Sequence, residues 1–265
     1  MTSGEPVRGA AIVRPPGASF ARALSEHPDR ATIDPVRAAA QHAAYREALR
    51  RAGLDLVQLP PDEELPDACF VDDCAVVAGG DALLTRPGAP ARAAEPERLA
   101  GALTRLVVRV ERMRSPATLD GGDVLALGDT LVVGRSLRTN QAGVDQLAVF
   151  AAARGLRVAA AELPAGTLHL QSGVTALGGE ALVGSPELLD QPAFRSVETR
   201  VPVPPEEAGR CNVVAVGRSV VMVAGCPRTA AALAALGLEV IEVDLSEFTK
   251  ADGGPTCLSL FACPT

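Results

Sequence analysis

Two side chains of the sequence have the chemistry of a nucleophile and of a proton carrier. Cys257 follows the turn Gly253-Gly254-Pro255 and precedes an alternating apolar stretch. A cysteine at a Gly-rich turn can be exposed to substrate and activated as a thiolate. His169 lies between Leu168 and Leu170, and histidine serves as a general base near neutral pH. Each residue alone has a structural alternative, a buried thiol or a core histidine, but together they predict a Cys/His catalytic site.

Carboxylates gather near the beginnings of two predicted strands. Asp67, Asp72 and Asp73 lie in Pro66–Val77, and Asp120 and Asp123 enclose two glycines in Leu119–Val124. Such clusters are common in ordinary turns, but they also suit the binding of a cation. Arg92, in the following Pro/Gly-rich loop, could meet an anionic group. A Cys/His pair surrounded by acids favours attack on an electron-poor carbon that carries nitrogen leaving groups.

Four stretches of similar sequence predict the hairpins that would position these residues. Each has an apolar run, a short turn with Gly, a second apolar run and a Gly/Pro/Ser stop. They are Val76–Gly88, Val124–Ser136, Val174–Pro186 and Val213–Pro227. Their starts are 48, 50 and 39 residues apart, which indicates a repeated supersecondary unit.

Helical patterns and short apolar strands fill the intervals. The helical patterns are Pro35–Gly53, Glu95–Leu106, Thr139–Gly155 and Arg228–Gly237. The strands that follow them are Leu54–Leu59, Val107–Val110, Leu156–Ala160 and Leu238–Val243, with a further strand at Ala10–Arg14. The Pro-rich stretch Gln191–Gly209 lacks a convincing helix, which predicts one abbreviated unit.

The repeat predicts an α/β fold of about five ββαβ-type units. A doubly wound parallel sheet is the usual result of alternating helices and strands. A radial α/β propeller is favoured because hairpins recur in every unit and no GxGxxG opens a helix after the first strand. We therefore expect one catalytic domain over residues 1–265, with its active site at the centre of the ring.

Composition excludes several classes of protein. The 265 residues carry a net charge of −7, with 48% hydrophobic and 22% charged residues, which argues against a disordered chain. No basic run marks a nucleic-acid surface, and no apolar run approaches the length of a membrane span. Residues 1–8 lack the apolar core of a signal peptide. Six cysteines without a CxxC spacing argue against a structural zinc site. We expect a soluble, cytoplasmic protein.

Six motifs in order resemble the dimethylarginine dimethylaminohydrolase family of the guanidino-group modifying (pentein) superfamily. They extend over almost the whole chain: Asp67–Asp73, Leu84–Arg92, Leu119–Val124, Arg138–Asn140, His169–Ser172 and Asp252–Cys257. Each motif is short, but six in order are specific. The resemblance implies a five-bladed α/β propeller, in agreement with the repeat.

The resemblance also implies roles for individual residues. Cys257 would be the nucleophile, His169 the general acid/base, and Asp120 its orienting partner. The implied substrate-binding residues are Asp73 and Asp72 for the guanidinium, Arg92 and Arg138 for the α-carboxylate, and Asp67, Ala251 and Asp252 for the α-amino end. Phe20 falls near the mobile N-terminal lid of the family, where Leu is more usual.

The implied reaction is hydrolysis of Nω-methylated L-arginines, asymmetric dimethylarginine or monomethylarginine, to L-citrulline and the amine. It proceeds through a covalent thiouronium on Cys257 and needs no metal or organic cofactor. A guanidinium carbon is a poor electrophile, so carboxylates that orient it and a nearby thiolate address both proximity and charge. We expect a small-molecule substrate as the partner, no nucleic acid or membrane, and a monomer or homodimer.

Two departures from the family pattern affect substrate preference, and three alternatives stay open. Ala93 stands where a second Arg is frequent, and Asp72 replaces a commoner Glu, which would enlarge the pocket near the guanidinium. Deimination of arginine itself is the first alternative, although 265 residues leave no room for the added helical domain of classical arginine deiminases. A non-catalytic binding propeller is the second. The third is a metal site that uses Cys257 and His169, at most inhibitory.

Overall fold

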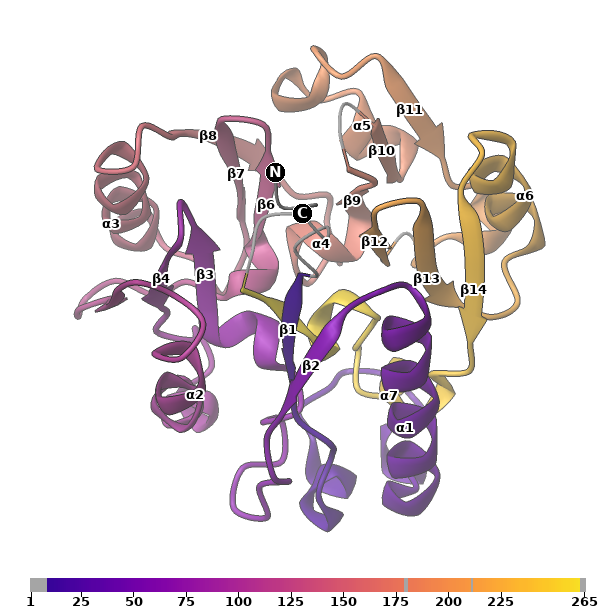
Figure 1. Cartoon of the computed structure of the whole chain (residues 1–265), viewed down its shortest axis with the longest axis horizontal. Helices are drawn as coiled ribbons and strands as arrows, with labels where there is room; N and C mark the ends of the chain where they lie inside the picture. The colour runs from indigo at the N-terminus through magenta and orange to yellow at the C-terminus, as the bar shows by residue number, and fades with distance from the viewer. Residues whose placement is uncertain (1–8, 179–180, 211, 263–265) are drawn as a thin grey trace, which may run out of the picture.

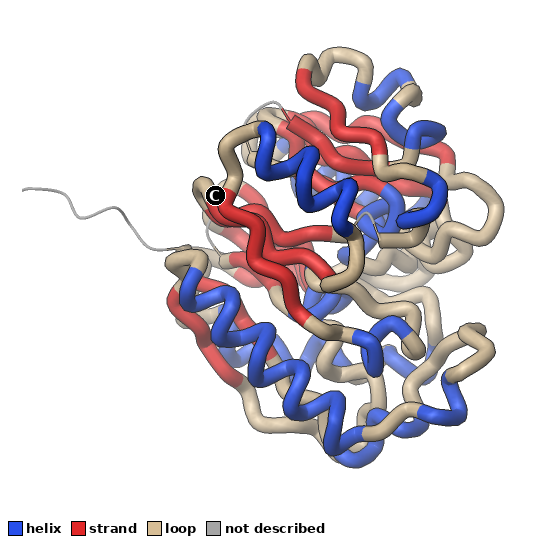
Figure 2. The backbone as a smooth tube through the Cα atoms, turned by 90° about the vertical axis from the view of Figure 1, so that its right-hand side faces the viewer, coloured by secondary structure: helices blue, strands red, loops and turns tan. Residues whose placement is uncertain are grey.

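The computed structural model describes residues 9–178, 181–210 and 212–262. Within these ranges, fifteen strands form five three-stranded sheets that surround a common centre, with the longer helices at the periphery (Figure 1). A second view shows these helices packed on the outside of the strands (Figure 2). The predicted five-bladed α/β propeller is confirmed.

Three blades have the predicted order of hairpin, helix and parallel third strand. The first is β3 (Ala75–Ala78), β4 (Asp81–Leu84), α2 (Glu95–Leu103) and β5 (Val110–Arg112). The second is β6 (Val124–Leu127), β7 (Thr130–Arg135), α3 (Gln141–Ala152) and β8 (Arg157–Glu162). The third is β12 (Val213–Val216), β13 (Ser219–Val223), α6 (Pro227–Ala235) and β14 (Glu239–Val243). In each, the hairpin strands pair antiparallel and the third strand runs parallel to the second.

A fourth blade is abbreviated, as the Pro-rich stretch predicts. It consists of β9 (Val174–Ala176), β10 (Ala181–Gly184), α5 (Pro186–Leu189) and β11 (Thr199–Pro202). Between β10 and β11, the chain forms only the single turn of α5 and a 3-10 turn at Pro192–Phe194. The ring therefore keeps its sheet here with little helical cover.

The fifth blade is assembled from segments far apart in the sequence. Its strands are β1 (Ala10–Val13), β2 (Asp55–Gln58) and β15 (Leu260–Phe261). The strand β15 pairs antiparallel with β1, at Ala11↔Phe261, and β1 pairs parallel with β2. Its helix, α1 (Pro35–Arg51), begins where the Asp34 side chain accepts hydrogen bonds from the N–H groups of Val36 and Arg37. Pairing of β15 with β1 closes the ring.

The segments that directly precede the first strand of each blade are the ones that position the site. We call them the entry segments: Val71–Cys74 before β3, Gly121–Asp123 before β6, 169–173 before β9, Asn212 before β12 and Thr256–Leu258 before β15. Equivalent places in a ring lie near one another around its axis. None of the described helices combines the length and apolar character that a membrane crossing requires.

Candidate active site

One small cavity brings together most of the residues that the sequence predicts for the site. Its lining includes Asp67, Asp73, Arg92, Arg138, His169, Ala251, Asp252 and Cys257, together with Leu24, Phe70, Leu168 and Gly253. Asp120 does not line the cavity but lies behind it, bonded to His169. Two predicted residues lie elsewhere: Phe20 and Asp72 are not part of this lining.

His169 is held between carboxylates. Its Nε2 lies 3.0 Å from Oδ2 of Asp120, and its Nδ1 lies 3.9 Å from Oδ1 of Asp73. The other oxygen of Asp120, which is fully buried, accepts a hydrogen bond from the Gly88 N–H at 2.8 Å. Burial acts to lower the pKa of His169, but the charge of Asp73 and the hydrogen bond to Asp120 outweigh it and raise this pKa to about 9. The imidazole is therefore protonated at neutral pH.

Asp73 is the charged carboxylate of the cavity. Its Oδ2 accepts a hydrogen bond from Nη1 of Arg92 at 2.6 Å, and its Oδ1 accepts one from the Gly122 N–H at 3.1 Å. Burial favours the neutral acid, but the charges of His169 and Arg92 outweigh it and hold the pKa of Asp73 below its usual value. A carboxylate in this state can receive a guanidinium.

The two glycines between Asp120 and Asp123 permit close approach of the entry segments. A Cβ at Gly121 would lie 2.0 Å from the backbone oxygen of Asp72. A Cβ at Gly122 would lie 2.8 Å from Oδ1 of Asp73 and 3.2 Å from Nδ1 of His169. Neither glycine has a positive φ, so the reason for glycine here is space.

Cys257 lies in a one-turn 3-10 helix, Thr256–Leu258, directly before β15. Its Sγ accepts a hydrogen bond from the Gly254 N–H at 3.4 Å. Burial and the neighbouring charge of Asp73 raise the pKa of the Cys257 thiol to about 12. The thiol is therefore neutral in the free protein, and it needs a cation beside it to become a thiolate at neutral pH.

Arg92 is more firmly engaged by the protein than the resemblance implies. Besides its bond to Asp73, the guanidinium donates two close hydrogen bonds to Glu95, Nε to Oε2 at 3.0 Å and Nη2 to Oε2 at 2.7 Å, and one to the Phe70 carbonyl at 3.2 Å. Arginine has five N–H donors, so one on Nη1 is left for a ligand. Burial raises the pKa of Glu95 to about 7, against the opposing charge of Arg92.

The guanidinium of Arg138, unlike that of Arg92, is not engaged by other described side chains. Arg138 is half-buried, lines the same cavity, and has no guanidinium hydrogen bond to any of the residues that the structure describes. Its backbone N–H donates to the Ser136 hydroxyl, which fixes the loop after β7. A free guanidinium at a cavity is suited to a carboxylate, to which it can donate two parallel hydrogen bonds.

Asp67 and Asp252 hold a short segment, residues 24–26, over the cavity. Oδ1 of Asp67 accepts a hydrogen bond from the Leu24 N–H at 3.0 Å. Oδ2 of Asp252 accepts hydrogen bonds from the Ser25 hydroxyl at 2.7 Å and the Glu26 N–H at 3.2 Å. The cavity beneath measures about 30 Å³, whereas typical ligand pockets begin near ~300 Å³. The cavity is therefore smaller than an arginine-sized molecule requires.

Phe20 occupies the interior beneath this segment. Its side chain is fully buried and packs edge-on against Phe70, with ring centroids 5.9 Å apart, and against Phe248 at 5.1 Å. The side chain of this N-terminal region that reaches the cavity is Leu24, four residues later. The sequence gives no periodic signal in this Pro-containing loop from which Leu24 could have been identified.

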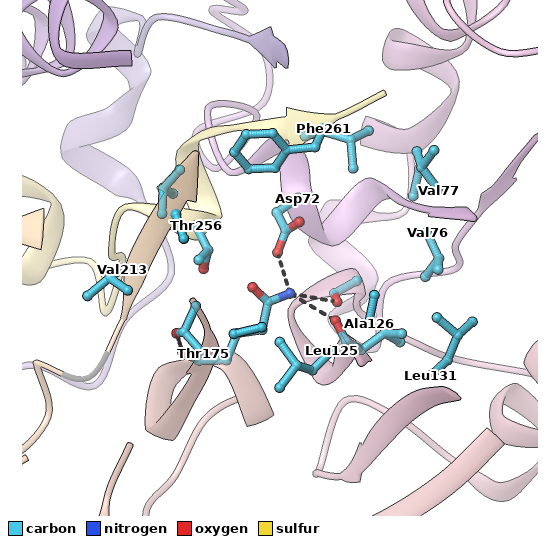
Figure 3. A pocket seen from close by; sticks show the side chains of 18 residues that line it. Asp72, Val76, Val77, Leu125, Ala126, Leu131, Thr175, Val213, Thr256 and Phe261 are labelled. Carbon is cyan, nitrogen blue, oxygen red and sulfur yellow. Dashed lines mark hydrogen bonds between the residues drawn. The ribbon is translucent and has the colours of Figure 1, made fainter. Parts of the chain in front are cut away.

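Asp72 points to the opposite side of its entry segment, into a central cavity of about 220 Å³ (Figure 3). Its Oδ2 accepts a hydrogen bond from the Gln171 side-chain amide at 3.1 Å. Burial and the charge of Asp73 raise the pKa of Asp72 well above its usual value. The remaining walls of the central cavity are largely apolar, as at Val76, Leu125 and Phe261. The structure thus separates the two adjacent aspartates.

Two acidic residues support the site without being among its predicted members. Asp123 accepts hydrogen bonds from the Ser136 and Thr139 hydroxyls and from the Leu170 N–H, next to His169. Burial raises the pKa of Asp123 to about 6. Glu95 is the second, and its spacing of three residues from Arg92 at the beginning of α2 is the signal that could have identified it.

One group of side chains has the geometry of a metal-ligand set. Carboxylate and imidazole atoms of Asp73, Asp120 and His169 all lie within 4.8 Å of one another. The same side chains already bond to each other and to Arg92 and Gly122.

Four described cysteines, Cys69, Cys74, Cys226 and Cys257, are free thiols. Cys211 and Cys263 lie outside the described residues.

Comparison with known proteins identifies relatives that extend over nearly the whole chain. The family model described as arginine deiminase matches residues 96–201. The chain is 42% identical over 250 residues to N(G),N(G)-dimethylarginine dimethylaminohydrolase of Streptomyces coelicolor, covering 94% of this chain and 95% of the relative. It is 38% identical over 228 residues to the protein of the same name from Pseudomonas aeruginosa, covering 86% and 89%.

Solved structures agree with this result. The chain resembles the Pseudomonas aeruginosa protein, a cysteine-to-serine mutant complexed with citrulline, with a TM-score of 0.88 and 35% identity over 95% of this chain and 98% of the other. It also resembles a histidine-to-glycine dimethylarginine dimethylaminohydrolase adduct with S-methyl-L-thiocitrulline, with a TM-score of 0.91, 35% identity, and coverage of 96% and 100%. The N-terminal domain of ArgZ, an arginine dihydrolase, shares the fold at 21% identity, with a TM-score of 0.85 and coverage of 96% of this chain and 98% of that domain.

Proposed function

Because the chain belongs to the dimethylarginine dimethylaminohydrolase family, we propose that it hydrolyses Nω-methylated L-arginines to L-citrulline and dimethylamine or methylamine. The observation that carries the proposal is the meeting of Cys257, His169 and Asp73 in one cavity that also has a free arginine, Arg138. This arrangement has a nucleophile, a proton donor, a site for a cation and a site for a carboxylate.

The substrate is held at its two ends. Asp73 binds the guanidinium nitrogens, while Arg138 and the free N–H of Arg92 bind the α-carboxylate. Asp67, Asp252 and the backbone of Ala251 face the α-amino group from beneath the lid. Asp72 is turned away into the central cavity, so it influences the guanidinium only through its neighbour.

Attack begins when the cationic substrate lies beside Cys257. Its positive charge lowers the pKa of the thiol, which loses its proton to solvent, and the thiolate forms a C–S bond to the guanidinium carbon. The tetrahedral adduct then breaks the C–N bond to the methylated nitrogen. The imidazolium of His169 donates its proton to the departing amine and is left neutral.

Hydrolysis of the resulting thiouronium returns the protein to its starting state. Neutral His169 accepts a proton from a water molecule as the water oxygen bonds to the same carbon. The C–S bond breaks, and Cys257 leaves as a thiolate that is reprotonated. The net reaction consumes one water and releases citrulline and the amine. Asp120 keeps the imidazole oriented in both halves of the cycle.

We also propose that the whole ring is one catalytic unit that acts in the cytoplasm as a monomer or homodimer. Cys257 enters the site from the blade that the two ends of the described chain build together, so no smaller part contains all the catalytic groups. Free thiols among the described cysteines fit a reducing compartment.

Citrulline release from asymmetric dimethylarginine, monomethylarginine and arginine tests the proposal. The wild type should act on the methylated substrates, and Cys257→Ser should lose at least about 10⁴-fold in kcat. Arginine deimination is the second candidate, because the arginine deiminase model matches residues 96–201. A clear preference for arginine would select it, and no citrulline from any of the three would refute both.

A further inference from the structure

The entry segment before β12, Asn212, also contributes a side chain to the back of the catalytic site. Four entry segments carry Asp73, Asp120 with Asp123, His169 and Cys257 or directly adjoin them. The equivalent place before β12 holds Asn212, which is buried. An amide is neither an acid, a base nor a nucleophile at neutral pH, so a contribution from Asn212 must come through its hydrogen bonds.

Asn212 holds the segment that carries the nucleophile. Its Oδ1 accepts a hydrogen bond from the Thr256 N–H at 2.7 Å, and its Nδ2 donates to the Thr256 hydroxyl at 2.6 Å. Thr256 directly precedes Cys257. A Cβ at Gly254 would lie 2.7 Å from Cγ of Asn212, so glycine there lets the amide lie flat against the turn. The nucleophile's turn is therefore held by the Asn212 side chain, together with Tyr45, whose hydroxyl donates to the Pro255 carbonyl at 2.7 Å.

The second N–H of the same amide reaches the segment that carries the acid/base. Nδ2 of Asn212 also donates to the Gln171 carbonyl at 3.0 Å. Gln171 lies two residues after His169, and its own side-chain amide donates to the Asp72 carboxyl at 3.1 Å and the Val124 carbonyl at 3.0 Å, in the central cavity of Figure 3. Two amides in series thus connect all the entry segments.

Asn212 makes these hydrogen bonds without lining the catalytic cavity. It is absent from the lining of that cavity and lies instead on an adjoining cavity, which shares Leu168, Asp252 and Gly253 with the catalytic one. The contacts of the amide are with Thr256 and Gln171, next to the catalytic residues but not with them. A side chain so placed acts on geometry and not on binding.

We propose that Asn212 is a positioning residue that fixes the Cys257 thiol relative to the His169 imidazole. The catalytic part of this inference rests on the proposed function. A displacement of about 1 Å between reacting groups can cost about 10² in rate. Asn212→Ala should therefore lower kcat by about 30- to 100-fold. KM should stay within about threefold, because Asp73 and Arg138 keep their places.

Gln146 provides the matched control. Its side chain also joins separate segments, away from the site: its Oε1 accepts a hydrogen bond from the Arg114 N–H at 2.9 Å, and its Nε2 donates to the Arg114 carbonyl at 2.8 Å. Gln146→Ala should lower Tm but leave kcat within about twofold. A kcat loss in Asn212→Ala no greater than in Gln146→Ala, measured per folded molecule, would overturn the proposal.

Asn212→Asp distinguishes the two links of the amide. The carboxylate keeps the acceptor for the Thr256 N–H and loses the donor to the Gln171 carbonyl. We expect a kcat loss close to that of Asn212→Ala, because the connection to the His169 segment is the one removed. Full wild-type kcat in Asn212→Asp would show that the connection is not needed and would overturn the proposal.

Alkylation of Cys257 by iodoacetamide gives a measurement that does not depend on turnover. A loosened turn exposes the thiol and moves it from Asp73, so its pKa falls. We expect Asn212→Ala to react about tenfold faster than wild type at pH 8, followed at the Cys257 peptide by mass spectrometry, and Gln146→Ala to react at the wild-type rate. If the wild type releases no citrulline, the proposed function fails and this measurement alone decides the inference: an unchanged rate overturns it.

Discussion

The catalytic cavity and the central cavity lie on opposite sides of the same entry segments and surround their aspartates with different partners. The catalytic cavity has Asp73 as a carboxylate between Arg92 and His169. The central cavity has Asp72 hydrogen-bonded to Gln171, among largely apolar walls. The surroundings of these two neighbouring carboxyl groups thus shift their pKa values in opposite directions, up for Asp72 and down for Asp73. Sequence proximity alone says little about which acid does chemistry.

The sharpest way to break this comparison is to neutralise each aspartate in turn. Asp73→Asn removes the carboxylate that receives the guanidinium, and kcat/KM should fall by about 10³. Asp72→Asn changes a side chain that lies outside the catalytic cavity and keeps its shape, and kcat/KM should stay within about fivefold. Steady-state kinetics on dimethylarginine measure both. Equal losses in the two variants would contradict the separation of the cavities.

A second comparison separates the two arginines of the catalytic cavity. Arg138→Ala should raise KM by about 30-fold with little change in Tm, because its guanidinium is free for the substrate carboxylate. Arg92→Ala leaves Glu95 and Asp73 buried without their cation, so the free energy of unfolding should fall by about 3–5 kcal/mol. Urea unfolding and kinetics on both variants check this, and a stable Arg92→Ala protein would show that its ion pairs are dispensable.

Close packing on the catalytic side predicts a smaller effect at Gly122. The Cβ of Gly122→Ala would displace Asp73 or His169, and kcat should fall by about tenfold. Gly101, in α2, has nothing within 4 Å of an added Cβ, so Gly101→Ala should leave kcat unchanged and stabilise the protein by about 0.5–1 kcal/mol. A Gly122→Ala protein with wild-type kcat would mean that the turn can shift to accommodate the methyl group without displacing Asp73 or His169.

The last expected effect is a pH dependence of stability from His169. Its pKa in the folded protein, about 9, lies above the ordinary value of 6.5, so the folded state binds this proton more tightly. The stabilisation is complete below pH 6.5 and is lost as pH rises through 9. NMR titration of the imidazoles can verify it, with His42 as the internal contrast, since burial lowers its pKa to about 3. Titration of His169 near 6.5 would contradict the carboxylate arrangement around it.

The sequence predicts the elements that recur from blade to blade along the chain. Hairpins and helices repeat, and the structure confirms their places to within a few residues, as for α1 (Pro35–Arg51). The convergence of Cys257, His169 and Asp73 on one cavity also follows from their positions before first strands. A repeat predicts which residues occupy equivalent positions in the blades, and the site is built from residues at such positions.

The remaining features depend on contacts that have no period. Asp72 and Asp73 share one turn of 3-10 helix, and only the partners across the ring determine which way each one points. The strand β15 has two residues, too few for a pattern, and it exists because β1 lies beside it. Leu24 and Phe20 lie in a Pro-containing loop, where burial of the larger aromatic ring decides their places.

The pairing of β15 with β1 determines when the protein can become active during its synthesis. Four blades are complete in the chain before residue 257 is added, so these parts can fold as they leave the ribosome. The nucleophile comes three residues before β15, the strand that completes the fifth blade by pairing with β1. A nascent chain therefore contains Asp73, Arg92 and Arg138 well before its thiol, and the pairing of β15 with β1 both closes the ring and completes the catalytic machinery.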